Sequence, residues 1–244
     1  MEFEYLVYFV LTTILSTIFA IAGLGSAVGL VPSLNIAGLS FDLARASGLF
    51  VNSITTITTS VLNLKKKLFD MEFVAPLVIS SSIMAFIGAK ISFLVDTELI
   101  KTIFGFTLIV IASMILFFKK PTNPNKKHNK LILLFAGSFG GVFSGFLGIG
   151  GGSIISPILL LFGYDAKKIA IGITFVIPFS SIVAFSSYAS VIELDYILLG
   201  IVGVGAFIGG IIGNYILHFK VSSTMIKKIL AFALYIIAFK MLLG

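Results

Sequence analysis

The chain of 244 residues contains no cysteine and few charged residues, which make up 11% of the sequence. Without cysteine there are no disulfides, no thiolate metal sites and no cysteine nucleophiles, and the redox compartment stays open. Apolar residues make up 58% of the chain, and its mean hydropathy of +1.16 lies far outside the range of soluble proteins. The composition therefore indicates a polytopic membrane protein.

Acidic residues are absent from the middle of every long apolar stretch, and the two histidines, His128 and His218, lie away from the centres of these stretches. A proton relay of intramembrane carboxylates is therefore not expected. The lack of clustered Asp, Glu, His or Cys also argues against a membrane hydrolase, an oxidoreductase and a transition-metal transporter. We expect no enzymatic activity, no cofactor and no bound metal.

A helix that crosses a bilayer needs about 20 predominantly apolar residues. Stretches of roughly this length recur along the chain, at Tyr5–Ala22, Ala44–Leu64, Phe73–Val95, Ile100–Phe118, Leu131–Leu147, Ile169–Ala189, Tyr196–Phe219 and Ile226–Leu243. Glu2 and Glu4 precede the first stretch, where a secretory signal carries Lys or Arg, so we expect this first helix to be retained. The sequence thus predicts an all-α, multi-pass protein.

Glycines interrupt one apolar stretch near the middle of the chain, at Gly148, Gly150, Gly151 and Gly152. Consecutive glycines are poor helix formers, so we predict a helix break followed by a short second helix at Ser153–Phe162. A broken helix leaves unpaired N–H groups at a new N-terminus, which attracts anions, and such helices mark the substrate sites of secondary transporters. Alternatively, these glycines only allow helices to pack closely.

The second half of the chain repeats the first. At an offset of 125 residues, Gly148 and Gly150 align with Gly23 and Gly25, and Pro157 aligns with Pro32. The only long polar, proline-rich stretch lies between the halves, as a linker would. We interpret the chain as a first repeat (residues 1–118), a cytoplasmic linker (119–130) and a second repeat (131–244).

Basic residues indicate how the two repeats are oriented, because cytoplasmic loops collect Lys and Arg. They cluster at residues 65–67, in the linker, at 167–168 and at 220–228. All of these clusters share one face only if Ser153–Phe162 turns back beside the helix before it, and Ser26–Ala37 forms the same kind of hairpin. Each repeat then has a Gly-broken helical hairpin plus three transmembrane helices, and the copies are inverted, with both termini outside. The net charge of +7 sets this orientation, and we expect no nucleic-acid partner.

The stretches that follow the hairpins are rich in hydroxyl groups, such as Thr56 and Thr174. Hydroxyls can coordinate an oxyanion, but they also hydrogen-bond to their own helix or to a neighbouring one. Asn52 and Pro178 are more informative, because an amide costs free energy in lipid and a proline frees a backbone carbonyl. We expect both to face a cavity.

Arg45 is the only arginine in the chain. A planar guanidinium suits sulfonate, sulfate or carboxylate oxygens better than an ammonium does, so Arg45 is a candidate anion ligand. The alternative is a residue at a helix end that reaches the membrane interface beside Asp42.

These features resemble the TauE/SafE family, the sulfite and organosulfonate exporter-like permeases. The resemblance covers essentially the whole chain, and the residues that carry it are Gly148–Pro157, Ala170–Phe175 and Ile87–Ser92. It implies a multi-pass protein of the cytoplasmic (plasma) membrane that exports or imports small sulfur-containing anions such as sulfite, sulfoacetate or other organosulfonates. The family's Ala-x-Gly-Thr-Ser-Leu element ends here in Ile173-Thr174-Phe175, which removes hydroxyls that could bind substrate.

We therefore expect a transporter that holds an anion between the two hairpin tips, Gly25–Ala27 and Gly150–Gly152, and works by alternating access. The expected substrate-binding residues are Gly23, Gly25, Ser26, Ala27, Arg45, Asn52, Thr56, Gly148, Gly150, Gly151, Gly152, Ser153, Thr174 and Pro178. The expected partners are the anion, the lipid bilayer and a coupling ion, either a proton or sodium, while the oligomeric state is open. A passive anion channel and a non-transporting membrane scaffold subunit are the alternative functions.

Overall fold

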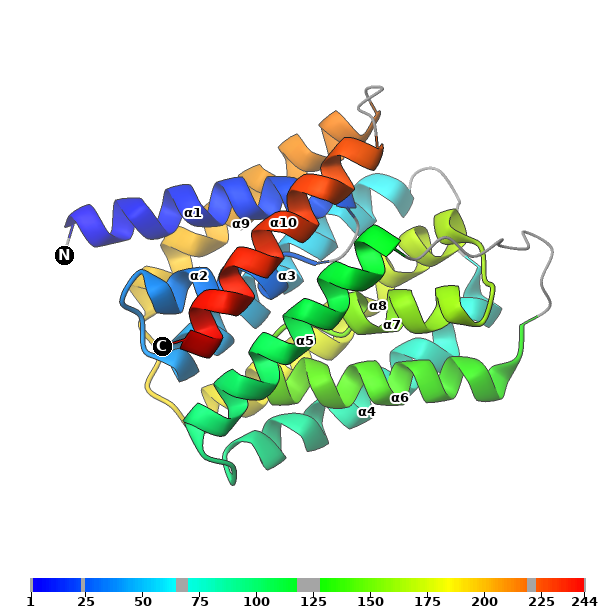
Figure 1. Ribbon diagram of the computed structural model, residues 1–244, viewed down its shortest axis with the longest axis horizontal. Helices are drawn as coiled ribbons and strands as arrows, with labels where there is room; N and C mark the ends of the chain where they lie inside the picture. The colour runs from blue at the N-terminus through cyan, green and yellow to red at the C-terminus, as the bar shows by residue number, and fades with distance from the viewer. Residues whose placement is uncertain (1, 23–24, 65–69, 118–127, 219–222, 244) are drawn as a thin grey trace.

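The computed structural model describes residues 2–22, 25–64, 70–117, 128–218 and 223–243. The regular structure within these ranges is helical (Figure 1). The helices are α1 (Glu2–Ala22), α2 (Ala27–Ile36), α3 (Phe41–Leu64), α4 (Met71–Ser92), α5 (Thr97–Phe117), α6 (Lys130–Leu147), α7 (Gly152–Leu161), α8 (Ala166–Ala189), α9 (Tyr196–His218) and α10 (Ser223–Leu243). The predicted all-α class is confirmed.

Six helices of the described chain, α1, α4, α5, α6, α8 and α9, are long and apolar enough to cross a membrane. By contrast, α2 and α7 have 10 residues each and are too short to cross one. They correspond to the predicted short helices Ser26–Ala37 and Ser153–Phe162. Gly23, residues 65–67 and most of the predicted linker (119–130) lie outside the described residues.

The predicted helix break occurs at the glycines. Helix α6 ends at Leu147, and its C-cap residue Gly148 has a left-handed backbone (φ 74°) and donates its N–H to the carbonyl oxygen of Ser144, 3.0 Å away. Helix α7 begins at Gly152. The hairpin of α1 and α2 matches it, because Gly25 also has a positive φ and lies just before α2.

The helices pack in the same way when the two halves of the chain are exchanged. Helix α1 packs on α9 as α6 packs on α4, and α3 packs on α9 as α8 packs on α4. Likewise α2 packs on α3 as α7 packs on α8, while the pairs α3–α8 and α5–α10 map onto themselves. In Figure 1, α3, α5 and α9 end toward the right, the side on which α4, α6, α8 and α10 begin. The duplication and the inverted repeat stay predictions.

The largest buried apolar cluster surrounds the hairpins. It joins Leu30 and Val31 of α2 and Leu147 of α6 to Phe104 of α5 and Leu234 of α10. The hairpin tips are therefore enclosed by the other helices, and any ligand that they bind lies inside the bundle.

Candidate functional site

Asn52 of α3 is completely buried and lies between the two hairpin tips. A Cβ atom at Gly25 would lie 2.6 Å from Asn52 Oδ1, and a Cβ atom at Gly150 would lie 2.0 Å from Asn52 Nδ2. Both distances are too short for any real side chain. Both glycines also have positive φ, 86° and 70°, which glycine adopts without steric cost. The two tips thus approach one amide group from two sides, and only glycine allows it.

The Asn52 amide is half paired. Its Nδ2 donates to the Ser181 hydroxyl of α8 across 3.0 Å, and its Oδ1 has no hydrogen-bond partner among the described residues. A buried polar atom without a partner costs about 1–3 kcal/mol, so native proteins rarely leave one. Because the Ser181 hydroxyl can donate or accept, the amide can turn either its oxygen or its NH₂ group toward the tips.

Three buried serine hydroxyls on the elements that meet at the tips also lack a partner within the described part of the chain. They are Ser26, Ser47 and Ser144. Ser26 is the N-cap residue of α2 but makes no side-chain capping bond, and Ser144 lies in the last turn of α6. Together with Asn52 Oδ1, these hydroxyls require a polar group that the described side chains do not supply.

The tips also present helix N-termini. Ala27 and Val28 of α2 and Gly152 and Ser153 of α7 precede the first backbone donors of their helices, so their N–H groups have no intrahelical partner. Such termini carry a positive partial charge and bind anions. The Ser153 hydroxyl donates to the Gly150 carbonyl oxygen across 3.3 Å and holds the tip of α7 together.

Arg45 is 1% exposed and lies inside the bundle, near the start of α3. Its Nη2 forms an ion pair with Asp42, and its Nη1 donates to the Phe146 carbonyl oxygen at 3.0 Å. The guanidinium lies 5.0 Å from the ring centroids of both Phe41 and Tyr188. Arg45 therefore holds the negative, C-terminal end of α6, and only its Nε lacks a partner among the described residues.

Sequence reasoning missed Tyr188. Its hydroxyl donates to the Gly145 carbonyl oxygen across 2.9 Å and lies 3.1 Å from the Ser92 hydroxyl. Tyr188 and Arg45 thus hold adjacent carbonyls in the last turn of α6. A single tyrosine near the end of α8 carries no local signal of this role, because the contact joins residues 43 positions apart.

The expected hydroxyl ligands bond to their own helices. Thr56 donates to the Asn52 carbonyl, and Thr174 donates to the carbonyls of Ala170 and Ile171. Pro178 is buried, and the Thr174 carbonyl that it frees accepts a hydrogen bond from Ser60 of α3, 2.7 Å away. The bond between Ser60 and the Thr174 carbonyl joins α3 to α8.

The other expected glycines make packing contacts. A Cβ atom at Gly148 would lie 2.7 Å from Arg45 Cβ, one at Gly151 would lie 3.1 Å from the Gly140 carbonyl oxygen, and one at Gly152 would lie 2.4 Å from Ile177 Cδ1. A side chain at any of these glycines would collide with a neighbouring helix, as the alternative interpretation of close packing predicts. The backbone of these glycines is nevertheless part of the tip.

A second polar cluster joins the start of α4 to the start of α8. Asp70 Oδ2 lies 2.8 Å from Lys168 Nζ and 2.9 Å from His128 Nε2, and Asp70 also caps α4. The hydrogen bond from Lys168 lowers the pKa of Asp70 to about 2, against a smaller opposing effect of burial. Asp70 and His128 lie outside the membrane-spanning segments, and Lys168 is the first residue of the span in α8.

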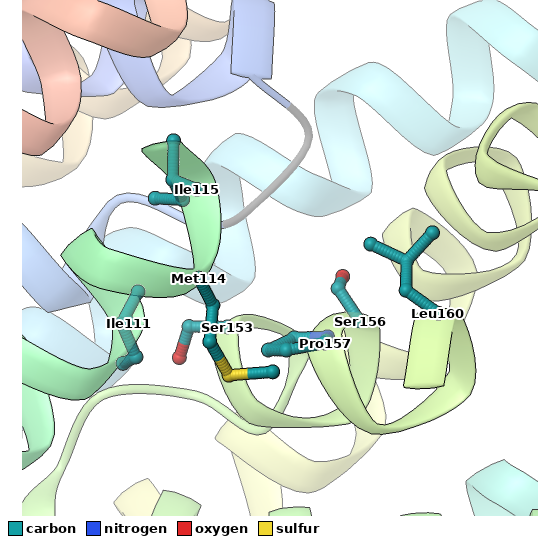
Figure 2. A pocket seen from close by; sticks show the side chains of 7 residues that line it. All are labelled: Ile111, Met114, Ile115, Ser153, Ser156, Pro157 and Leu160. Carbon is teal, nitrogen blue, oxygen red and sulfur yellow. The ribbon is translucent and has the colours of Figure 1, made fainter. Parts of the chain in front are cut away.

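An apolar groove lies between α5 and α7. In Figure 2, Ile111 and Met114 of α5 face Ser153 and Pro157 of α7 across it. The groove therefore begins at the first turn of α7, next to the hairpin tip.

Comparisons with known proteins agree with these features. The family model for the sulfite exporter TauE/SafE family matches residues 8–241. The probable membrane transporter protein YunE of Bacillus subtilis (strain 168) is 25% identical over 238 residues, which cover 86% of this chain and 87% of YunE. The probable membrane transporter protein YjnA of the same organism is 26% identical over 215 residues, covering 80% and 84%.

A plant protein is also similar over a shorter region. The sulfite exporter TauE/SafE family protein 1 of Arabidopsis thaliana is 28% identical over 127 residues, which cover 49% of this chain and 26% of the plant protein. The resemblance that the glycine-rich hairpin suggested is thus confirmed. The chain belongs to the sulfite exporter TauE/SafE family and is a multi-pass membrane transporter rather than an enzyme.

Proposed function

We propose that this protein is a secondary transporter of small sulfur-containing anions, such as sulfite, sulfoacetate or other organosulfonates, and that it holds the anion at the hairpin tips around Asn52. One observation carries the proposal: both tips close on a single buried amide whose Oδ1 has no partner among the described residues. The description of the family supports the class of anion, because it names a sulfite exporter.

The chemistry of the tips suits an oxyanion. Burying an unpaired anion costs many kcal/mol, so the site must replace the water that the anion loses. The N–H groups at the starts of α2 and α7 have no partner among the described residues, and they are donors for this purpose. The Ser26 hydroxyl and the Asn52 NH₂ group, once it is turned toward the tips, are further donors. The Arg45 guanidinium is already paired with Asp42 and the Phe146 carbonyl, so its positive charge attracts the anion without contacting it.

The two halves of the chain provide alternating access in this proposal. Residues 1–118 and 131–244 form inverted copies joined by a cytoplasmic linker (119–130), and they rock about the tips where they meet. The exchange-symmetric packing of the helices supports this view. Transport against a gradient requires a coupling ion, and a proton and sodium are the two candidates.

Binding by an Asn52→Leu variant tests the site, because leucine keeps the branched heavy-atom shape of asparagine and removes its donors and acceptor. We expect the purified variant to bind sulfite, thiosulfate, sulfoacetate and taurine at least tenfold more weakly than the unmodified protein, with sulfate as the control anion. Ser53→Ala is the matched control, since the Ser53 hydroxyl bonds only within α3, to Leu49. Unchanged binding by Asn52→Leu would show that the anion does not bind at the tips.

Flux measurements in proteoliposomes separate a transporter from a channel. A secondary transporter accumulates the anion against its gradient when a proton or sodium gradient is imposed, whereas a passive channel only dissipates the gradient of the anion. Accumulation driven by one of these two ions also identifies the coupling ion. Dissipation alone, under both gradients, would favour the channel.

A further inference from the structure

We infer that the groove between α5 and α7 binds the carbon chain of the transported anion, so that the protein prefers sulfonates with a short apolar tail to inorganic sulfite. The inference rests on the proposed function, because it places the charged end of the same anion at the tip of α7. The groove is then a second subsite, for the carbon chain, with its own residues and its own specificity.

The groove has the lining of a small-ligand pocket, because such pockets are mostly apolar and carry a few polar groups. Ile111, Met114 and Ile115 form its α5 wall, and Pro157 and Leu160 form most of its α7 wall. A methionine side chain adapts its shape to different apolar partners, which suits a subsite for chains of varying length.

The groove is continuous with the proposed anion site through Ser153. The backbone N–H of Ser153, at the start of α7, has no hydrogen-bond partner among the described residues, and its hydroxyl bonds to the Gly150 carbonyl at the tip. The same residue lines the groove (Figure 2). A sulfonate group held at this N-terminus therefore has the groove as the adjacent space for its carbon atoms.

The two hairpins differ at the residues that line the groove. The offset of 125 residues that aligns Pro157 with Pro32 also aligns Ser153 with Val28 and Ser156 with Val31. Both valines are buried in the apolar cluster that surrounds the first hairpin. In the second hairpin the smaller serine side chains leave space instead. An anion at the tips thus meets this open groove beside α7, which fits a ligand with one charged end and one apolar end.

Affinity across a series of sulfonates tests the inference on the purified full-length protein. The series runs from methanesulfonate to butanesulfonate, with sulfite as the tail-free reference, and is measured by titration calorimetry. Each methylene that leaves water for an apolar site strengthens binding about fourfold, so we expect affinity to rise by about this factor per methylene until the groove is full.

Filling the groove should remove this gain. Met114→Phe adds volume to the α5 wall, and we expect it to weaken butanesulfonate binding at least tenfold while sulfite binding stays unchanged. Val110→Phe is the matched control, because Val110 lies on the same helix but is 56% exposed on its outer face. It should leave both affinities unchanged.

Several results would overturn the inference. Equal affinities across the sulfonate series, or butanesulfonate binding that Met114→Phe does not alter, would show that no tail occupies the groove. Equal weakening of sulfite and butanesulfonate by Met114→Phe would show that the groove makes no contact specific to the tail. If Met114→Phe loses a co-purified phospholipid in native mass spectrometry but binds the sulfonates as the unmodified protein does, the groove holds a lipid chain. Failure of the unmodified protein to bind any of these anions would instead overturn the proposed function, and the inference with it.

Discussion

Arg45 of α3 donates from Nη1 to the carbonyl oxygen of Phe146 across 3.0 Å, a contact between residues 101 positions apart. The bond ties the first half of the chain to the end of α6 in the second half. Because Tyr188 holds the neighbouring carbonyl of Gly145, the two residues anchor one helical turn next to the glycine tip. Several measurable consequences follow from this anchor, the tips and the Asp70 cluster.

Arg45→Lys should destabilise the folded protein although it keeps the charge. Lysine cannot bond to Asp42 and Phe146 as a planar fork, nor stack on Phe41 and Tyr188, so we expect a loss of about 1.5–3 kcal/mol. Thermal unfolding in detergent measures it. Tyr188→Phe removes one hydrogen bond and should cost about 1 kcal/mol. If both variants melt as the unmodified protein does, Arg45 and Tyr188 do not anchor α6.

Gly150→Ala should abolish anion binding. The new Cβ atom would lie 2.0 Å from Asn52 Nδ2, so either the amide or the tip must move. Gly38→Ala is a matched control, because Gly38 also has a positive φ (105°) but has no atom within 4 Å of its Cβ position. Both variants bear the backbone strain of about 1–2 kcal/mol, and only Gly150→Ala should lose binding per folded molecule. Equal anion binding by the two variants would show that the anion does not bind at the tip beside Asn52.

Gly141→Leu should lower the yield of folded protein. A Cβ atom at Gly141 would lie 2.4 Å from the Ser81 carbonyl oxygen of α4, so the two helices could no longer pack closely. Gly200→Leu on α9 is the control, since its Cβ position has no atom within 4 Å and faces outward. Size-exclusion chromatography of both variants in detergent measures the effect. A monodisperse Gly141→Leu protein at normal yield would argue against this packing.

Stability should fall at low pH through Asp70. Its pKa of about 2 in the folded protein lies below its ordinary value of 3.8, so the carboxylate stabilises the fold above about pH 4 and loses this effect as the pH falls toward 2. Asp70→Asn keeps a helix-capping side chain but removes the charge. We expect the melting temperatures of the two proteins to differ at pH 6 and to converge near pH 2. A constant difference across this range would exclude the ion pair with Lys168 as its cause.

Single-cysteine labelling should reveal the orientation, because the chain has no cysteine of its own. We expect cysteines at Asn125 and Ala166 to react from the cytoplasmic side, and one at Glu193 to react from the outside. The reason is that a hairpin of α6 and α7 returns the chain to the side where α6 began. Labelling of positions 125 and 166 from opposite sides would refute both the hairpin and the inverted repeat.

Local chemistry was enough to predict the helices and their break. Apolar stretches of bilayer length stand at the observed helices within a few residues, and the glycine run marks the end of α6 and the start of α7. The sequence also pointed to Asn52 as a polar residue that needs a reason to be in a membrane helix. These predictions succeed because helix propensity, apolar length and backbone freedom depend on neighbouring residues.

Tertiary structure alone decided how the polar side chains are used. Arg45, which the sequence left between an anion ligand and an interface residue, is buried against Asp42, Phe146 and Tyr188. Tyr188 had no local signal at all, and the hydroxyls of Thr56 and Thr174 turned out to bond within their own helices. The sequence by itself determined a membrane bundle with two glycine-broken hairpins. Which groups meet at the tips depends on contacts between residues more than 100 positions apart, such as Asn52 with Ser181, and only packing of the whole chain creates them.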